Sequence, residues 1–362
     1  MASTEYKITW KRFLLLVVGV AAFLIYIYLF NVDIQKIIAT AQQINLSLYV
    51  LAATLVVIDT FLFALSWYFL LNYLSVKLSV VKSFLYVWYG IFVDALIPGE
   101  SISGEISKLY LITREDSTVS GKVVASFVTQ RLISMTVNIA SLLIGISTLL
   151  ALRQVGGIVL NLSLIMTIAI SIFVALLLLL CIKENWTLKI ANAGIRFLEY
   201  LIRGHWKQQL TKFKEEVTKA ARMFHDSMKE FRHTPKTLFV SSFFNAFSWV
   251  LDLTVIYLVF LSIGFSIQWS IIILTCSLLV AIKSVPIGIP FEAGLPEIAM
   301  SSLFIWLGVP PDISFTVTIL SRILTMWLRF FIGFAVQQWV EIEYVKSASK
   351  QNKMTMPETE KT

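Results

Sequence analysis

Residues 98–105 read PGESISGE, and residues 290–297 read PFEAGLPE. Each stretch interrupts strongly apolar sequence with proline, glycine and two glutamates, a combination that a continuous membrane helix seldom carries. The matching positions are Pro98, Glu100 and Glu105 in the first stretch and Pro290, Glu292 and Glu297 in the second. Because the spacing is identical, the two breaks indicate a duplicated chain.

Other charged residues keep the same order around the two breaks. An aspartate lies upstream, Asp59 in VVIDTF and Asp252 in WVLDLT. An arginine lies downstream, Arg131 in QRLISM and Arg322 in SRILTM. All these landmarks are separated by 191 to 193 residues, so we predict an internal duplication. The two copies are residues 46–150 and 237–342.

The composition places this duplicated chain in a membrane. It has 362 residues, of which 57% are hydrophobic and only 14% are charged. Runs of about 18 or more apolar residues predict membrane-spanning helices. About six full spans are expected, near residues 13–30, 46–71, 123–150, 158–182, 237–263 and 313–340. Two further apolar segments run into the breaks, and we expect both to be re-entrant broken helices. They are residues 84–97 and 269–289.

The basic residues predict how the chain crosses the membrane. If both broken segments enter and leave on one side, most lysines and arginines fall on a single face. By the positive-inside rule this face is cytoplasmic, and both termini of the multi-pass cell-membrane protein lie there. The two copies then enter from opposite sides, so the predicted fold is all-α and polytopic with two inverted-topology repeats.

The expected organisation has five parts. An N-terminal span and outer connector precede the first repeat, a linking span and a cytoplasmic amphipathic helix join the repeats, and a cytoplasmic tail follows. Inverted repeats that carry broken helices at equivalent positions are typical of transporters whose site lies between the repeats. In chain order the parts are 1–45, 46–150 with broken segment 84–113, 151–236, 237–342 with broken segment 269–304, and 343–362.

Several classes of function are not expected. The net charge is +8. In a membrane protein, basic residues are concentrated on the cytoplasmic side, so this charge does not indicate a nucleic-acid partner, and we expect none. Cys181 and Cys276 both fall inside predicted spans and offer no metal-ligand spacing. The sequence has no HExxH, Walker loop or GxSxG motif. We therefore expect neither an enzyme nor a metal or cofactor site, whereas association into a homo-oligomer is compatible with the sequence.

Three arginines, Arg131, Arg322 and Arg329, lie within predicted spans, where an unpaired charge costs at least about 2.5 kcal/mol. Arginine's planar fork holds either a carboxylate or a phosphate by two hydrogen bonds. Arg131 and Arg322 either pin the broken segments by ion pairs or contact the phosphate of a lipid head group. Asn138 occupies the position that corresponds to Arg329 and is expected to line the same cavity. The carboxylates available for pairing are Glu105 and Glu297, or Asp59 and Asp252.

The glutamates at the breaks have two open roles. Proline or glycine directly before Glu105 and Glu297 resembles a helix start, where an acidic side chain faces the positive end of the helix dipole. A proton-carrying role is about as well supported. Glu100 and Glu292 lie five residues earlier, so on a continuous helix they would face another direction and form no catalytic dyad.

These motifs also have a family resemblance. The order DALIPGESISGEISKLYLITRE, TQRLIS, PIGIPFEAGLPEIAM and SRILTMWLRF resembles the lysylphosphatidylglycerol synthase transmembrane region family, also called flippase-like or UPF0104 proteins. The fullest bacterial members join this membrane domain to an aminoacyl transferase, which this sequence lacks after Trp339. The resemblance implies a stand-alone, translocator-like member.

The resemblance and the residues together lead to two functional hypotheses. In the first, the protein moves a phosphate-bearing lipid between leaflets. The lipid is a membrane phospholipid or, as stand-alone relatives imply, a polyprenyl phosphate lipid. In the second, an ion-coupled secondary transporter moves a small polar solute. The candidate substrate-binding residues are Arg131, Arg322, Glu100, Glu105, Glu292, Glu297, Asp59, Asp252, Arg329 and Asn138.

Overall fold

The computed structural model describes most of the chain beyond residue 41. Glu100 and the expected span 13–30 lie outside the described residues. The described part is built of helices and contains no strand, which confirms the all-α prediction. The described residues are 35, 39, 42–97, 102–152, 157–183, 186, 189, 193, 207–283, 292 and 294–355.

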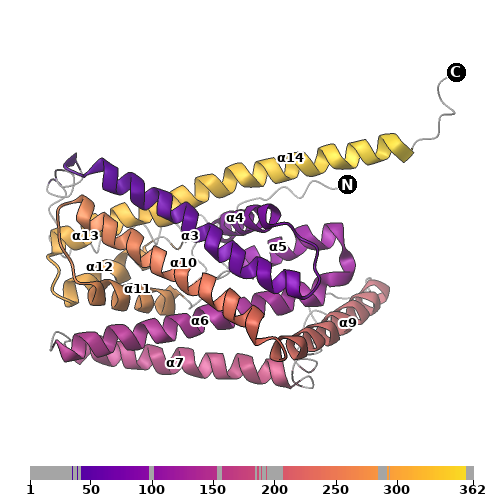
Figure 1. The fold of residues 1–362 in the computed structure, drawn as a ribbon, viewed down its shortest axis with the longest axis horizontal. Helices are drawn as coiled ribbons and strands as arrows, with labels where there is room; N and C mark the ends of the chain where they lie inside the picture. Colours follow the sequence, from indigo (N-terminus) through magenta and orange to yellow (C-terminus); the bar gives the residue numbers. More distant parts are fainter. Residues whose placement is uncertain are drawn as a thin grey trace.

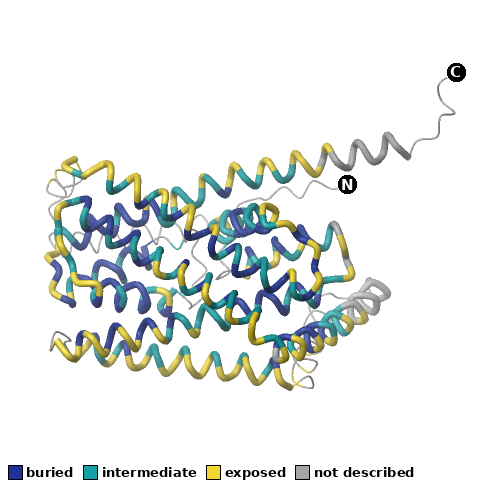
Figure 2. The backbone as a smooth tube through the Cα atoms, in the orientation of Figure 1, coloured by how far each residue is buried: buried dark blue, intermediate teal, exposed yellow. Residues whose placement is uncertain are grey.

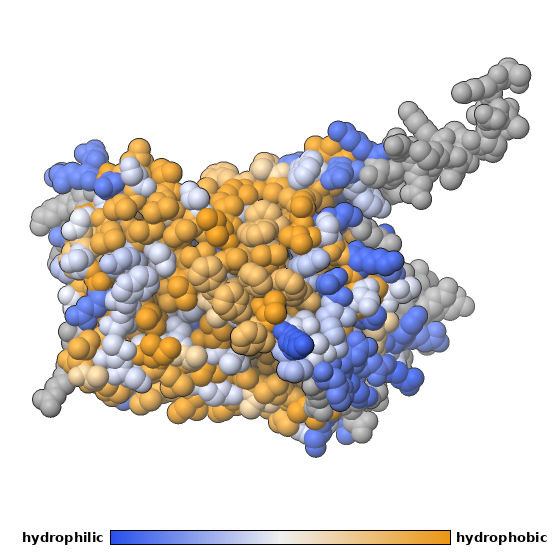
Figure 3. Space-filling model, in the orientation of Figure 1, coloured by the Kyte–Doolittle hydropathy of each residue, from blue (hydrophilic) through white to orange (hydrophobic). Residues whose placement is uncertain are grey.

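Five helices in the described ranges are long and apolar enough to cross a membrane. They coincide with the five predicted spans that fall within the described residues, and the prediction of a polytopic membrane protein is confirmed. They are α3 (Leu46–Tyr73), α6 (Ser120–Ala151), α7 (Gly157–Ile182), α10 (Pro235–Ser262) and an interrupted helix over Pro311–Tyr344. Figure 3 shows an apolar belt across the middle of the molecule and hydrophilic residues towards its ends.

The last of these spans is not a regular helix. It consists of α13 (Pro311–Arg322), a π-helical segment η3 (Ile323–Leu328) and α14 (Arg329–Thr355). The corresponding part of the first copy, after Arg131, is regular α-helix within α6. A π-helical turn accommodates an extra residue and changes the direction of the side chains that follow. It therefore sets where Arg329 points relative to Arg322.

Two shorter helical pairs flank the two breaks. The first pair is α4 (Val80–Leu96) and α5 (Ile102–Glu115), followed by the short η1 (Ser117–Val119). The second pair is α11 (Trp269–Lys283) and α12 (Leu295–Trp306). The pairs lie towards opposite ends of the molecule in Figure 1. Two inverted repeats would produce this arrangement, although the duplication and the re-entrant path remain predictions.

The two long helices α3 and α10, which begin the two predicted copies, pack side by side along their length (Figure 1). The hydroxyl groups of Ser66 and Ser241 lie 2.8 Å apart across this contact. Small polar side chains let the backbones approach closely and replace water as hydrogen-bond partners inside a membrane. This packing holds Asp59 on α3 close to α10, because Ser248 of α10 donates a hydrogen bond to it.

The amphipathic helix α9 (Lys207–Arg232) packs against the helical bundle. Phe224 and Phe231 are buried, and the ring of Phe231 stacks on Tyr73 with 5.7 Å between centroids. Met223 lies against Gly121 of α6, where there is no room for a larger residue. The apolar face predicted from the sequence is therefore covered by the end of the bundle that also carries α5 (Figure 1).

Helix α7 is the most peripheral of the apolar helices (Figures 1 and 2). Only Val159, Ser163 and Cys181 are buried among its residues. Its outer side is formed by large apolar residues, including Ile165 and Ile172, that stay exposed. Exposed apolar residues along a whole helix are compatible with contact between that helix and membrane lipids.

The tight contact between α4 and α5 predicts an effect of one added methyl group. A Cβ on Gly104 would lie 2.6 Å from the carbonyl oxygen of Gly90 and would also collide with Asp94. We expect Gly104→Ala to destabilise the purified protein by about 1–3 kcal/mol, as overpacking generally does. Gly157→Ala is the control, because a Cβ there meets nothing within 4 Å. Equal melting temperatures of the two variants in detergent would contradict the packing.

The inverted arrangement predicts the accessibility of two loops. Asp116 follows α5, and Pro310 follows α12; both are exposed. We expect cysteines at these two positions to react with an impermeant maleimide from opposite sides of the membrane. Lys229→Cys on α9 should label from the same side as Asp116→Cys. The native Cys181 and Cys276 are buried and supply the background measurement. Labelling of Asp116→Cys and Pro310→Cys from one side would exclude inverted repeats.

Candidate functional site

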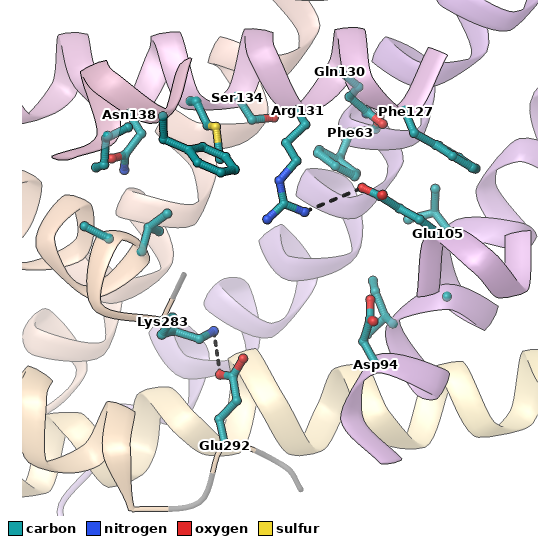
Figure 4. Close-up of a pocket in the computed structure, with 18 of the residues that line it drawn as sticks. Phe63, Asp94, Glu105, Phe127, Gln130, Arg131, Ser134, Asn138, Lys283 and Glu292 are labelled. Atoms are coloured by element: carbon teal, nitrogen blue, oxygen red, sulfur yellow. Dashed lines mark hydrogen bonds and ion pairs between the residues drawn. The ribbon is translucent and has the colours of Figure 1, made fainter. Parts of the chain in front are cut away.

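A cavity of about 600 Å³ lies between the first broken segment and helices α6, α7 and α11 (Figure 4). Its lining combines apolar side chains, such as Phe63 and Phe127, with six charged ones. Charged groups within an apolar, membrane-spanning bundle are functional candidates by default. The charged residues are Lys108, Arg131 and Lys283, together with Asp94, Glu105 and Glu292.

Arg131 on α6 and Glu105 on α5 face each other across this cavity (Figure 4). Arg131 Nη1 lies 3.8 Å from Glu105 Oε1, near the limit for an ion pair. Their side chains keep 24% and 28% of their surface exposed. Glu105 also lies in the first turn of α5, so the helix-start and pairing interpretations both hold for it. The two side chains are thus at the distance limit of an ion pair, and both are accessible from the cavity.

Lys108 contributes a second cation to the same wall. It lies three residues after Glu105 on α5 and is only 7% exposed. Its ammonium lies 4.8 Å from the ring centre of Trp67 and 4.7 Å from that of Phe127. Among the described residues, no carboxylate lies within ion-pair distance of it. Two aromatic faces therefore stabilise this buried cation.

Sequence reasoning did not single out Lys108, although one signal was present. Residues three apart on a helix lie on one face. A helix over this segment therefore places Glu105 and Lys108 on the same surface. The aromatic partners Trp67 and Phe127 come from α3 and α6, and no local pattern relates them to Lys108. Gln130 was also missed; it lines the cavity and donates to the Phe63 carbonyl at 3.0 Å.

The three remaining charged residues hold the ends of the broken segments. Asp94 Oδ1 accepts hydrogen bonds from Ser103 Oγ and from the Gly104 N–H, both at 2.6 Å, and thereby caps α5 across the first break. Lys283 Nζ lies 2.8 Å from Glu292 Oε2 across the second break. Asp94 and Lys283 thus hold the two breaks and also line the cavity.

The second arginine of the repeat is held differently. Arg322 Nε lies 2.6 Å from Glu297 Oε1, and only 11% and 12% of the two side chains are exposed. The other carboxylate oxygen of Glu297 accepts the Gly294 N–H at 2.8 Å, which caps α12 as its sequence predicts. Neither residue lines the cavity. Equivalent pairs are thus open to the cavity in one copy and closed in the other.

Arg329 joins the two repeated aspartates. Its Nη2 donates to Asp59 Oδ2 at 2.5 Å and to Asp252 Oδ1 at 3.0 Å. These contacts bring together α3, α10 and α14. Of the two pairings that the sequence left open, Glu105 and Glu297 are therefore the partners of Arg131 and Arg322. The alternative pairing of those arginines with the aspartates is wrong.

A smaller pocket of about 280 Å³ surrounds the Asp59, Asp252 and Arg329 triad. Asn138 lines both this pocket and the larger cavity, as expected from its match to Arg329. Its Nδ2 donates to the Ser277 carbonyl at 3.4 Å, whereas its Oδ1 is buried without a partner. The pockets adjoin along shared lining residues, which are Phe63, Ile91, Ser134, Asn138 and Val280.

The fold and site define a polytopic helical membrane protein that encloses a charged cavity beside a peripheral apolar helix. The family described as lysylphosphatidylglycerol synthase TM region matches residues 14–333, and the chain belongs to this family. A UPF0104 membrane protein of Pyrococcus horikoshii is 25% identical over 332 residues, which cover 89% of this chain and 95% of the relative. A second, from Methanocaldococcus jannaschii, is 21% identical over 351 residues, covering 96% and 99%.

The triad predicts a large cost when its cation is removed. Arg329→Met leaves two carboxylates without their shared partner, and breaking a buried ion pair in this way costs about 3–5 kcal/mol. Adding Asp59→Asn and Asp252→Asn to Arg329→Met removes the unpaired charges, so we expect most of the lost stability to return. Thermal unfolding in detergent measures both effects. A single variant as stable as the triple variant would show that the triad does not hold α3, α10 and α14 together.

Proposed function

We propose that this protein translocates a phosphate-bearing lipid between the leaflets of the cell membrane. The observation that carries the proposal is the large cavity, whose lining combines the cations Arg131 and Lys108 with apolar side chains. A head group with negative charge would enter a site that already contains its counter-ions. The apolar lining would accommodate the first part of the lipid chains.

The two cations support phosphate over a neutral solute. Lys108 is buried against two aromatic rings, and Arg131 meets Glu105 only at the limit of an ion pair. A phosphate that replaced Glu105 at Arg131 would receive bidentate hydrogen bonds, and it would offset the desolvation of Lys108. Lys283 lies 2.8 Å from Glu292, closer than Arg131 lies to Glu105. We therefore assign Lys283 to holding the second break and not to binding phosphate.

The position of α7 supports access from the lipid. Met166, Ala169 and Phe173 of this helix line the cavity, and most of α7 is exposed on its other side. Within the described part of the chain, α7 therefore lies between this side of the cavity and the surroundings. A lipid needs such a lateral path, because its chains stay in the hydrocarbon while its head group crosses.

The asymmetry of the two arginine pairs supports alternating access. In inverted-repeat transporters, one repeat adopts the conformation that the other leaves, which moves the opening from one face to the other. Here the Arg131 pair lies open to the cavity, and the Arg322 pair is closed. We assign the open side to the cytoplasm, since α9 and the basic residues Lys77, Lys82 and Lys122, in the loop before α4 and the first turns of α4 and α6, accompany the first broken segment.

The proposal predicts different effects of the two arginines. We expect a phosphate-bearing lipid to copurify with the wild-type protein and to be lost from Arg131→Gln, because Arg131 lines the cavity. Arg322→Gln should retain the lipid while unfolding at a lower temperature, because its pair is closed and caps α12. Mass spectrometry of the bound lipids and thermal unfolding measure these two outcomes.

Two results would contradict the proposal. If no phosphate-bearing lipid is enriched on the wild type, or if folded Arg131→Gln keeps the same lipid, Arg131 serves only to hold α5. The ion-coupled transport of a small polar solute would then be the better hypothesis. Loss of lipid from both variants would instead indicate that the two copies bind the head group together.

A further inference from the structure

We propose that this protein takes up a proton at Asp252 when it binds the phosphate-bearing head group, so that the smaller pocket couples translocation to protons. The coupling rests on the proposed function, because it assigns the phosphate to the adjoining cavity. The proton site itself can be tested without any lipid.

The charged groups inside the described part of the bundle do not balance. Three carboxylates each lie within ion-pair distance of a cation of their own, and Asp94 interacts electrostatically with Lys108. The excess negative charge therefore belongs to the triad, in which one arginine serves two aspartates. Counted over the linings of both pockets and the Arg322–Glu297 pair, the cations are Lys108, Arg131, Lys283, Arg322 and Arg329, and the carboxylates are Asp59, Asp94, Glu105, Asp252, Glu292 and Glu297.

A proton is the simplest group that removes this excess. An unpaired carboxylate in an apolar bundle is costly, and a buried carboxyl group avoids that cost by binding a proton. A proton needs no coordination shell, whereas a metal ion needs several ligands in a suitable geometry. In the part of the chain that the structure describes, no three His, Cys, Asp or Glu side chains are grouped so that they could hold a metal ion. The triad therefore fits a proton better than a metal ion.

Asp252 is the carboxylate that is best placed to take up the proton. Both oxygens of Asp59 accept hydrogen bonds, Oδ1 from Ser248 and Oδ2 from Arg329, and only 8% of its side chain is exposed. Asp252 accepts from Arg329 through Oδ1, and no hydrogen bond among the described residues engages its Oδ2. Its side chain is 27% exposed and lines the smaller pocket. A proton on Asp252 leaves Arg329 and Asp59 as a balanced pair.

The surroundings of Asp252 contain few other titratable groups. Asp59 faces it from α3 and Arg329 faces it from α14. The buried thiol of Cys276 lies near it on α11. Helix α6 contributes only uncharged side chains to the lining of this pocket. A change in charge at this pocket is therefore a change at the triad.

The charge of the triad acts on a phosphate in the adjoining cavity. Asn138 lines the smaller pocket and lies seven residues after Arg131 on α6, which is about 10 Å along the helix axis. Removing one negative charge at this distance strengthens the binding of an anion about tenfold, at the effective dielectric constant typical of proteins. Acidic pH, which protonates Asp252, therefore favours the head group. By thermodynamic linkage, the head group in turn promotes proton uptake.

Infrared spectroscopy of the purified full chain in detergent tests the proton site. The wild-type protein should show a carbonyl band of a protonated carboxylic acid that Asp252→Asn lacks, and titration to alkaline pH should remove this band. Asp226→Asn is the matched control, because Asp226 is exposed on α9 and pairs with Lys229. If Asp252→Asn does not fold, Asp59→Asn takes its place, since either substitution removes the excess charge. A wild-type protein without the band at any pH, or a folded variant that retains it, would overturn the proton site.

The binding of phosphatidylmethanol between about pH 5 and pH 9 tests the coupling. This phospholipid carries one phosphodiester charge and no other ionisable group, so its own charge stays constant. We expect the wild type to bind it about tenfold more tightly at the acidic end, and folded Asp252→Asn to bind it tightly at both ends. Glu105 lines the larger cavity beside Arg131, and its titration would act in the same direction. Glu105→Gln should keep the tenfold pH dependence, whatever its overall affinity.

The outcomes separate the coupling from the proposed function. A pH dependence that persists in Asp252→Asn and is lost from Glu105→Gln would belong to the larger cavity and would overturn the coupling. Equal affinity of the wild type at both ends of the pH range would do the same. A requirement for sodium over choline at constant pH would replace the proton by a metal ion. If the phospholipid binds at no pH, the translocation proposal and the coupling fail together, and the infrared difference still decides whether Asp252 holds a proton.

Discussion

The cost of an unpaired charge in hydrocarbon is the constraint on which this structure depends. Every described ionisable side chain at the centre of the bundle is therefore tied to another element, and each tie also positions helices. Arg329 shows this most clearly, because its bonds to Asp59 and Asp252 join α14 to the packed pair of α3 and α10. The same electrostatic requirement that makes these residues costly thus fixes the relation between the two copies.

The same constraint explains why the broken segments are held at their ends. A break in a membrane helix exposes backbone groups that lipid cannot satisfy. Asp94 accepts the Gly104 N–H across the first break, and Glu297 accepts the Gly294 N–H at the start of α12. The carboxylates that looked out of place in apolar sequence therefore satisfy the backbone, and their remaining oxygens are available to pair with arginine or to face the cavity.

Hydropathy and charge were sufficient to predict the helical spans, because each span is encoded by its own contiguous residues. The repeat spacing also pointed to Arg131, Glu105 and Glu292, which line the cavity, but it did not point to Lys108. It did not settle their partners, since Arg131 could have met Glu105 or Asp59, and the choice depends on how α5 packs on α6. The π-helical segment was not predictable either: its sequence, ILTMWL, has no proline or glycine, and tertiary contacts decide its geometry.

A perfect duplication would have placed an arginine at position 138 as well as at 329. Two arginines would then have neutralised both aspartates and filled the pocket with guanidinium groups. Asparagine at this position leaves one net negative charge beside the pocket and places a shorter side chain there, with its amide oxygen buried. The departure from symmetry therefore creates the smaller pocket, and it does so on the helix that carries Arg131. In this chain the predicted duplication accounts for the shared framework, and Asn138, which lines both pockets, is a position where the two predicted copies differ.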